Sequence, residues 1–226
     1  MENIIYRVIC IIIGYGFGLF QTAYIYGKLN NIDIRDFGSG NAGTTNAMRT
    51  LGKKAGIITF IGDILKAIIC SILIYFVFKG IVNDRHFVMI LRLYGGVGVI
   101  LGHNFPFYMG FKGGKGVAAS AGVVLGLFDL KIIIIEIALF IAVTAISKYV
   151  SLGSLCITAA LFIEFVIFNE LKIFGFHNDM HFGGAWRIET YLILFFIGAL
   201  AWYKHRANIV RLLNGTERKI GEKKEV

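Results

Sequence analysis

Long apolar segments separated by short polar loops occupy most of the chain. Seven segments are almost wholly apolar, at residues 4–25, 57–78, 87–101, 117–128, 132–146, 152–168 and 189–203. A helix needs about 20 apolar residues to cross the hydrocarbon core of a bilayer, and it satisfies its own backbone in lipid. A soluble all-α protein would show a polar face on most of its helices, and these segments show almost none. The pattern therefore predicts an all-α integral membrane protein with about seven transmembrane helices.

The composition supports this class of protein. The 226 residues are 57% hydrophobic and only 16% charged, whereas a soluble domain carries about a quarter charged residues. The mean hydropathy is +0.72. No internal repeat or low-complexity tract is visible, so residues 1–226 are expected to form a single polytopic membrane domain. Segment 117–128 is short for a span, and two alternatives stay open for it: a full crossing that begins inside the preceding loop, or a re-entrant half-helix.

The basic residues predict the orientation in the membrane. With seven spans, one side holds loops 28–56, 102–116 and 147–151 and the tail from residue 204, which together contain fifteen of the 23 Lys and Arg. The opposite side holds six, and Lys66 and Arg92 lie within apolar segments. Because positive charge is retained in the cytoplasm, the N-terminus is expected outside and the C-terminus in the cytoplasm.

Three further features are not expected to carry chemistry. The three cysteines lie in apolar segments without metal or redox spacing and are expected to pack in the core: Cys10, Cys70 and Cys156. The net charge of +9 follows from the cytoplasmic bias, so no nucleic-acid partner is expected. A loop with His177, Asp179 and His181 could hold a metal, but it is predicted on the outer side without a further ligand nearby. A solvated loop is preferred, and neither a metal nor a cofactor is expected.

The first of three unusual polar loops lies on the predicted cytoplasmic side. Its sequence is Gly38-Ser39-Gly40-Asn41-Ala42-Gly43-Thr44-Thr45-Asn46-Ala47-Met48-Arg49. Glycines allow successive backbone N–H groups to face one concavity that holds an anion. Hydroxyl and amide side chains add donors, and Arg49 offers a planar fork suited to phosphate. A turn followed by a capped helix would also favour Gly, Ser, Asn and Thr, but the density of donors beside a membrane favours an anion site.

The second loop contains Gly102-His103-Asn104-Phe105-Pro106 and then Phe111-Lys112-Gly113-Gly114-Lys115-Gly116-Val117. Pro106 is expected to end the preceding helix, because it has no N–H to donate. The glycine run is expected to open the next helix, where free N–H groups and the Lys115 ammonium would converge on an anion. Lys115 could instead extend from a helix end toward the headgroups. Ligand contact is preferred, because glycines stand on both sides of it.

The third loop follows the last apolar segment, with Lys204-His205-Arg206-Ala207-Asn208-Ile209, Arg211 and Asn214-Gly215-Thr216-Glu217. If the helix continues, His205 and Asn208 share one face. Alone, this stretch is an ordinary basic flank that binds lipid headgroups. Within the second apolar segment, Asp63 and Lys66 are costly in lipid and are expected to form an ion pair, or secondarily a wall of the site.

These motifs, in this order and spacing over nearly the whole chain, resemble the bacterial acyl-phosphate-dependent glycerol-3-phosphate acyltransferase family of the PlsY type. The resemblance implies a seven-span enzyme of the bacterial inner (cytoplasmic) membrane that works beside membrane lipid. It would transfer an acyl group from acyl phosphate to the 1-position hydroxyl of glycerol 3-phosphate. The products would be lysophosphatidic acid and inorganic phosphate, the first step of phospholipid synthesis. Direct attack fits the chain, which has no Gly-x-Ser-x-Gly elbow and no His-x4-Asp pattern.

The resemblance also implies roles for individual residues. Lys115, His205 and Asn208 would be catalytic: Lys115 would neutralise phosphate charge, and the other two would contact glycerol 3-phosphate near its hydroxyl. Whether His205 is a general base or a hydrogen-bond partner stays open. The expected substrate-binding residues are Ser39, Asn41, Thr45, Asn46, Arg49, His103, Lys112, Gly113, Gly114, Ser151 and Ser154.

Two rival functions are weighed against this one. A membrane carrier for a phosphorylated metabolite would place its binding residues near the midplane, often in paired repeats. A metal-dependent phosphatidyl transferase needs a cluster of carboxylates, and the predicted cytoplasmic loops contain too few. Both rivals are less favoured than the acyltransferase.

Overall fold

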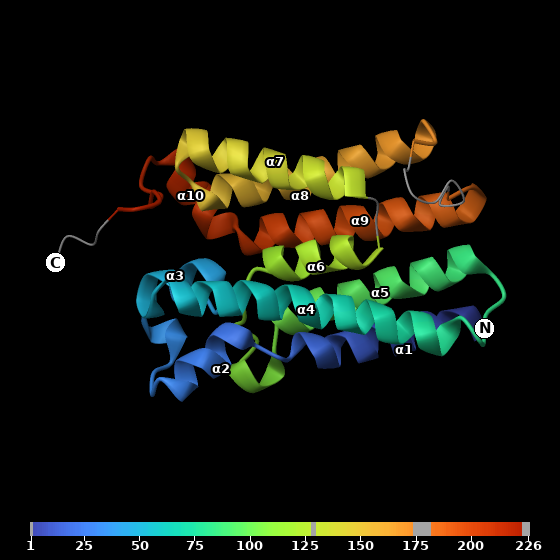
Figure 1. The fold of residues 1–226 in the computed structure, drawn as a ribbon, viewed down its shortest axis with the longest axis horizontal. Coiled ribbons are helices and arrows are strands. Elements are labelled where there is room, and N and C mark those ends of the chain that lie inside the picture. The colour runs from blue at the N-terminus through green and yellow to red at the C-terminus, as the bar shows by residue number, and fades with distance from the viewer. Residues whose placement is uncertain (1, 128–129, 174–181, 223–226) are drawn as a thin grey trace. The chain divides into compact units, whose positions relative to one another are not determined.

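The computed structural model describes residues 2–127, 130–173 and 182–222, and the elements found there are helices. The α-helices are α1 (Glu2–Gly18), α2 (Thr22–Leu29), α3 (Thr44–Leu51), α4 (Lys53–Phe78), α5 (Arg85–Asn104), α6 (Val117–Leu127), α7 (Leu130–Ser147), α8 (Val150–Glu170), α9 (Gly184–Lys204) and α10 (Arg206–Leu213). Two short 3-10 turns are η1 (Ile34–Asp36) and η2 (Phe107–Met109). The prediction of an all-α fold is confirmed (Figure 1).

The chain divides into two compact units. The first is Met1–Phe128 with Phe182–Ile193, and the second is Asp129–His181 with Leu194–Val226. Within the described ranges, six helical stretches are long and apolar enough to cross a membrane: Ile4–Leu29, Lys53–Phe78, Arg85–Met109, Leu130–Ser147, Val150–Glu170 and Gly184–Lys204. The predicted spans coincide with these six, except for segment 117–128, which forms the shorter helix α6. Seven crossings and the predicted orientation stay predictions.

Glycines explain how closely α1 packs on α5 in the first unit. A Cβ added to Gly14 would overlap the Gly95 carbonyl, and one added to Gly18 would overlap the Val99 carbonyl. The reverse holds for Gly102, whose added Cβ would meet the Tyr15 carbonyl. Small residues at such spacing let helix backbones approach in lipid, where hydrophobicity does not drive association.

The sequence predicted one apolar span at residues 4–25, but this segment consists of two helices, α1 and α2. It breaks between Gly18 and Thr22, and the buried side chain of Gln21 donates from Nε2 to the carbonyls of Gly18 (3.0 Å) and His103 (3.0 Å). Buried carbonyls at a helix end need such donors. The break therefore lies against the carboxyl end of α5, which ends at Asn104, two residues before Pro106 as predicted.

The short helix α6 packs on α4 and α5. Gly122 lies against the Ile64 carbonyl of α4, and Gly96 of α5 lies against Val123. Arg92 donates from Nε to the Ser71 hydroxyl (3.0 Å) and from Nη2 to the Gly126 carbonyl near the end of α6. A cation at the negative end of the helix dipole is favourable, and a backbone carbonyl is a usual partner for an intramembrane Arg.

The length of α6 bears on the two alternatives for segment 117–128. The helix begins at Val117 rather than inside the preceding loop. Its eleven residues correspond to about 16 Å at about 1.5 Å per residue, against about 30 Å for the hydrocarbon core. The described part of this segment is therefore too short to cross as a straight helix.

Side chains also tie α9 to α1 within the first unit. Arg7 donates to both carboxylate oxygens of Glu189, with Nε–Oε1 at 2.6 Å and Nη2–Oε2 at 2.8 Å. The Tyr94 hydroxyl donates to the same carboxylate (2.9 Å), and the Arg7 guanidinium lies 4.8 Å from the centroid of the Phe87 ring. The bidentate pair thus joins α1, α5 and the first part of α9.

In the second unit, α7 and α8 form a packed pair. Gly153 of α8 lies so close to α7 that an added Cβ would overlap the Thr144 hydroxyl. The turn between the two helices uses Lys148, which has a left-handed φ of 64°. The Lys148 carbonyl accepts from the Ile220 backbone N–H (2.8 Å), so the tail after α10 returns to this turn.

Candidate functional site

The first donor-rich loop ends in the short helix α3. Gly43 is the N-cap and provides no side-chain cap, so α3 begins with backbone N–H groups that no cap side chain accepts. Gly38 and Gly40 adopt left-handed φ values of 63° and 71°. Ser39 and Arg49 are exposed, and Asn41 and Thr45 are half-buried. These four predicted ligands therefore lie on the accessible side of the loop.

Asn46, by contrast, is used inside the loop. Its side chain is 1% exposed, its Oδ1 accepts from the Ser39 N–H (2.7 Å), and its Nδ2 donates to the carbonyls of Ile34 and Phe37 (both 3.0 Å). The amide thereby sets the curvature of the backbone around Gly38, where an added Cβ would overlap Oδ1. This arrangement favours a role in shaping the loop over the direct phosphate contact predicted for Asn46.

The first and second loops meet in the first unit. A small apolar core joins α2, η1, α3, α4 and η2; its buried members are Ala23, Ile34, Ala42, Ala47, Ala55 and Met109. Arg35 donates from Nη1 to the Met109 carbonyl (3.0 Å) and from Nη2 to Asp33 (2.7 Å). The hydrogen bonds from Arg35 lower the pKa of the Asp33 carboxyl to about 2. Arg35 therefore links the two loops, a role that the sequence analysis missed.

The second loop folds back onto the end of α5. Gly113 donates its N–H to the Asn104 carbonyl (3.2 Å), and Gly114 donates to the His103 carbonyl (3.1 Å). A Cβ on Gly113 would overlap the His103 carbonyl, and one on Gly114 would overlap His103 Nε2. Both N–H groups were predicted to bind substrate. Instead they cap α5, and the two glycines are required for close packing.

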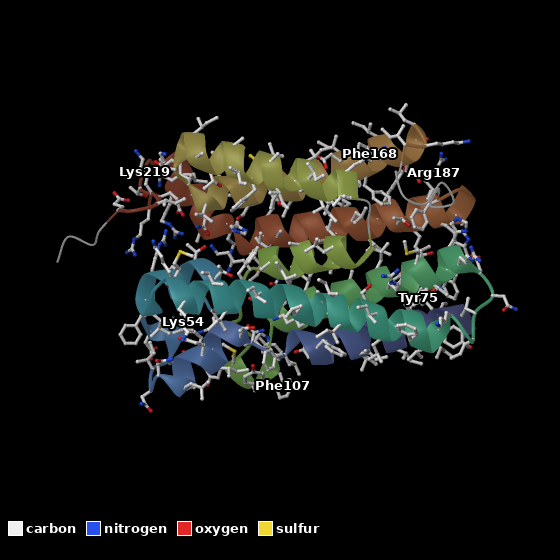
Figure 2. The ribbon with its side chains drawn as sticks, viewed as in Figure 1. Lys54, Tyr75, Phe107, Phe168, Arg187 and Lys219 are labelled. Atoms are coloured by element: carbon white, nitrogen blue, oxygen red, sulfur yellow. The ribbon has the colours of Figure 1, made fainter. Side chains whose placement is uncertain are left out.

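Lys115 and Gly116 come directly before α6. Gly116 has a left-handed φ of 84°, and its carbonyl accepts from the Ser120 N–H (2.7 Å) in the first turn. Lys115 is half-buried and Lys112 is exposed. The prediction that the glycine run opens a helix is correct, and Lys115 lies where the first N–H groups of α6 lack intrahelical acceptors. Phe107, in the same loop, is 59% exposed and projects outward (Figure 2).

The third loop does not continue the helix α9. The helix ends at Lys204, and His205 is the N-cap of α10, with φ −94° and ψ 3°. His205 Nδ1 lies 2.8 Å from the Ala201 carbonyl. Because a carbonyl can only accept, Nδ1 carries the proton, and Nε2 of the neutral ring is the acceptor. The condition under which His205 and Asn208 would share a face of one continuing helix is therefore not met, and the break at His205 places its ring against the Ala201 carbonyl.

Glu217 organises the rest of the third loop in the second unit. Its Oε1 accepts from Asn208 Nδ2 (2.8 Å) and from the Ser151 hydroxyl (3.0 Å), and its Oε2 accepts from Arg211 Nε (2.7 Å). Burial raises the pKa of the Glu217 carboxyl, but these three hydrogen bonds outweigh burial and leave it below its usual range. Glu217 was not among the predicted site residues, although it closes the Gly-x-Glu end of the third motif.

The two predicted serines of α8 behave differently. Ser151 joins the Glu217 cluster, whereas the Ser154 hydroxyl donates to the Val150 carbonyl of its own helix (2.9 Å). The possible metal ligands His177, Asp179 and His181 lie outside the described residues. Over residues 2–127, 130–173 and 182–222, no group of three His, Cys, Asp or Glu side chains could hold a metal.

The apolar helices and polar loops define a multi-pass membrane protein with donor-rich loops in each of its two units. Residues 8–215 match the family described as Glycerol-3-phosphate acyltransferase. The glycerol-3-phosphate acyltransferase of Clostridioides difficile (strain 630) is 40% identical over 227 residues and covers 100% of both chains. That of Chlorobaculum parvum (strain DSM 263 / NCIMB 8327) is 38% identical over 221 residues, covering 93% of this chain and 94% of the relative.

The solved structures of PlsY, an integral membrane glycerol 3-phosphate acyltransferase, are also similar. The glycerol 3-phosphate form has a TM-score of 0.77 at 31% identity, covering 95% of this chain and 96% of that one. The lysophosphatidic acid form has a TM-score of 0.75 at 30% identity, covering 95% of each chain. The chain therefore belongs to the glycerol-3-phosphate acyltransferase family and is an integral membrane acyltransferase, which confirms the resemblance found in its motifs.

Proposed function

We propose that the protein transfers a fatty acyl group from acyl phosphate to the 1-position hydroxyl of glycerol 3-phosphate, in the bacterial cytoplasmic membrane. Family membership over residues 8–215 supports the acyl acceptor, because the related PlsY has a glycerol 3-phosphate form. The products would be lysophosphatidic acid and inorganic phosphate. The reaction would supply the first intermediate of phospholipid synthesis.

The donor-rich loops match the charge of this reaction. Each substrate carries a phosphate, so the site must neutralise two anions. In the first unit, exposed Arg49 and half-buried Lys115 come from loops that share one apolar core, joined by Arg35. We assign Arg49 to the phosphate of glycerol 3-phosphate and Lys115 to the leaving phosphate, with Ser39, Asn41, Thr45 and Lys112 as further contacts.

The contact of His205 Nδ1 with the Ala201 carbonyl is the observation that carries the chemistry. With its proton held on Nδ1 by the Ala201 carbonyl, the ring offers Nε2 as an acceptor. An acceptor is what an attacking hydroxyl requires, whether it gives up its proton to the ring or only donates a hydrogen bond. Asn208, held by Glu217, follows one turn later and would orient the same hydroxyl.

The transfer needs no acyl-enzyme intermediate. The hydroxyl oxygen attacks the acyl carbonyl carbon, the new ester bond forms, and the bond from that carbon to the phosphate oxygen breaks. Inorganic phosphate leaves, and the hydroxyl proton passes to His205 or to the phosphate. Ser151 is held by Glu217 and Cys10 and Cys70 are buried, which supports direct transfer.

The test is an assay of the purified protein with palmitoyl phosphate and glycerol 3-phosphate in EDTA, with lysophosphatidic acid and phosphate as readouts. We expect turnover with acyl phosphate and none of comparable rate with palmitoyl-CoA. Comparable turnover with the thioester, or activity that needs added magnesium, would overturn the proposed donor and the metal-free site.

Two substitutions test the phosphate roles. Lys115→Gln and Arg49→Ala each remove one or two charge-assisted hydrogen bonds, about 1.5–3 kcal/mol apiece. At about 1.4 kcal/mol per decade, kcat/KM falls roughly ten- to ten-thousandfold. Arg49→Lys should recover only part of the loss, because an ammonium lacks the planar fork. Normal kinetics in Lys115→Gln, with an unchanged melting curve, would remove Lys115 from the mechanism.

A further inference from the structure

A buried polar cluster lies beneath the second loop, in the first unit. It consists of Asp63 and Lys66 on α4 and His103 near the end of α5, with side-chain exposures of 2%, 4% and 4%. The Lys66 Nζ lies 2.9 Å from Asp63 Oδ1, so the predicted ion pair is present. The Thr22 hydroxyl donates to the same oxygen (3.2 Å). A charged pair in apolar surroundings persists only where further hydrogen bonds satisfy it.

The geometry around Lys66 determines the protonation of His103. Nζ has three near partners: Asp63 Oδ1 at 2.9 Å, the Phe20 carbonyl at 2.8 Å and His103 Nδ1 at 2.8 Å. An ammonium has three protons and no lone pair, so it donates to all three. A protonated His103 would also lie near Asp63, with Nδ1 3.7 Å from Oδ1, but an amine is a much stronger base than an imidazole, so Lys66 holds the proton. His103 Nδ1 is therefore an acceptor, and the neutral ring carries its proton on Nε2.

His103 supports the second loop through both its backbone and its ring. Its carbonyl accepts from the Gly114 N–H (3.1 Å), and its Nε2 lies directly against the Gly114 α-carbon, where a Cβ has no room. Gly114 immediately precedes Lys115. Loss of the hydrogen bond from Lys66 would release the imidazole to rotate, and rotation would move the backbone that presents the Lys115 ammonium.

We propose that Lys66 is a positioning residue: paired with Asp63, it holds His103 as the neutral Nε2–H tautomer against Gly114 and thereby sets the position of Lys115. The catalytic consequence rests on the proposed function, whereas the tautomer does not. Lys66 and Asp63 act through His103 and the loop, and they do not touch the phosphates.

The tautomer is tested without any activity assay. Full-length protein labelled with ¹⁵N-histidine and reconstituted in lipid is measured by NMR, and the His103 signals are assigned by their loss in His103→Gln. We expect one protonated Nε2 and one unprotonated Nδ1 that accepts a hydrogen bond. The double variant Asp63→Asn/Lys66→Met removes both charges together. Its His103 Nδ1 should show the signal of an unprotonated nitrogen that no longer accepts a hydrogen bond from Lys66. A proton on Nδ1 in the parent protein, or unchanged signals in the double variant, would overturn the proposal.

The positioning role is tested by kinetics on the same double variant, with Lys79→Met as a matched control at the far end of α4. Misplacement of a catalytic group by about 1 Å costs on the order of a hundredfold in rate, so we expect a ten- to hundredfold loss of kcat/KM with the NMR change, and none in the control. His103→Gln, whose amide can replace the Nε2 donor, should retain more activity than His103→Leu. Normal kinetics in a double variant with altered His103 signals would refute the positioning role, whereas absent turnover in the parent protein would refute only the proposed function.

Discussion

Removal of the Glu217 carboxylate should destabilise the third loop and lower activity together. In Glu217→Ala, the amide of Asn208 and the hydroxyl of Ser151 lose their acceptor, while Arg211 loses its ion pair. A buried donor left without a partner costs about 1–3 kcal/mol, so the two neutral donors account for about 2–6 kcal/mol. Arg211 is 41% exposed, and its pair adds at most about 1 kcal/mol.

This loss is large against the roughly 5–15 kcal/mol that stabilise a folded domain. By the scaling of soluble chains of this size, about 2–4 °C per kcal/mol, a total of about 2–7 kcal/mol should lower the melting temperature by roughly 4–28 °C. Glu217→Gln keeps an amide oxygen for Asn208 and Ser151 and loses the charge and the acceptor for the exposed Arg211, so the fall in its melting temperature should be much smaller. The matched control is Glu222→Ala in the same tail, since among residues 2–127, 130–173 and 182–222 the contact of its carboxylate is with the exposed Lys219 N–H (2.9 Å).

Melting curves and turnover are measured for the three variants in the same lipid. The pH dependence of the melting temperature gives a second readout. Because the folded-state pKa of Glu217 is lowered, its contribution to stability is present above the ordinary value of 4.5 and is lost as the pH falls below it. The acid-induced loss of stability should therefore be smaller in Glu217→Gln. If Glu217→Ala has the same melting temperature as Glu222→Ala and loses the same stability at low pH, the Glu217 cluster does not stabilise the third loop and the reasoning is wrong.

Three further predictions follow from the packing and the sequence. Gly114→Ala should lower kcat/KM by at least tenfold, because its Cβ would overlap His103 Nε2, whereas Gly80→Ala, where a Cβ meets nothing, should match the parent enzyme. Replacement of all three cysteines by Ala should leave turnover largely intact in a folded protein, and its abolition would reopen an acyl-enzyme route. A single cysteine at Gly80 should react with an impermeant maleimide from outside and one at Gly221 only in inverted vesicles; labelling of both from one side would mean that segment 117–128 does not cross.

The sequence alone determined the class of protein and the positions of its three donor-rich loops. Hydropathy is a local property, since each span must by itself match the thickness of the bilayer, and the six long helices were found from it. Gly, Pro and polar residues mark loops through their own backbone preferences, which located the three motifs and the start of α6 after Gly116. The spacing of these motifs was also sufficient to identify the family.

The tertiary structure decided which polar groups form hydrogen bonds within the protein and are therefore not available to a ligand. Gly113 and Gly114 looked like anion-binding donors, but their N–H groups cap α5. Asn46 looked like a ligand, but its amide closes its own loop. The acceptors in these bonds depend on how the chain folds back, and no local pattern specifies them. For the same reason the sequence could not predict that Ala201 and Lys66 would set opposite tautomers in His205 and His103: a tautomer is fixed by the partner of each nitrogen, and only the fold brings that partner to it.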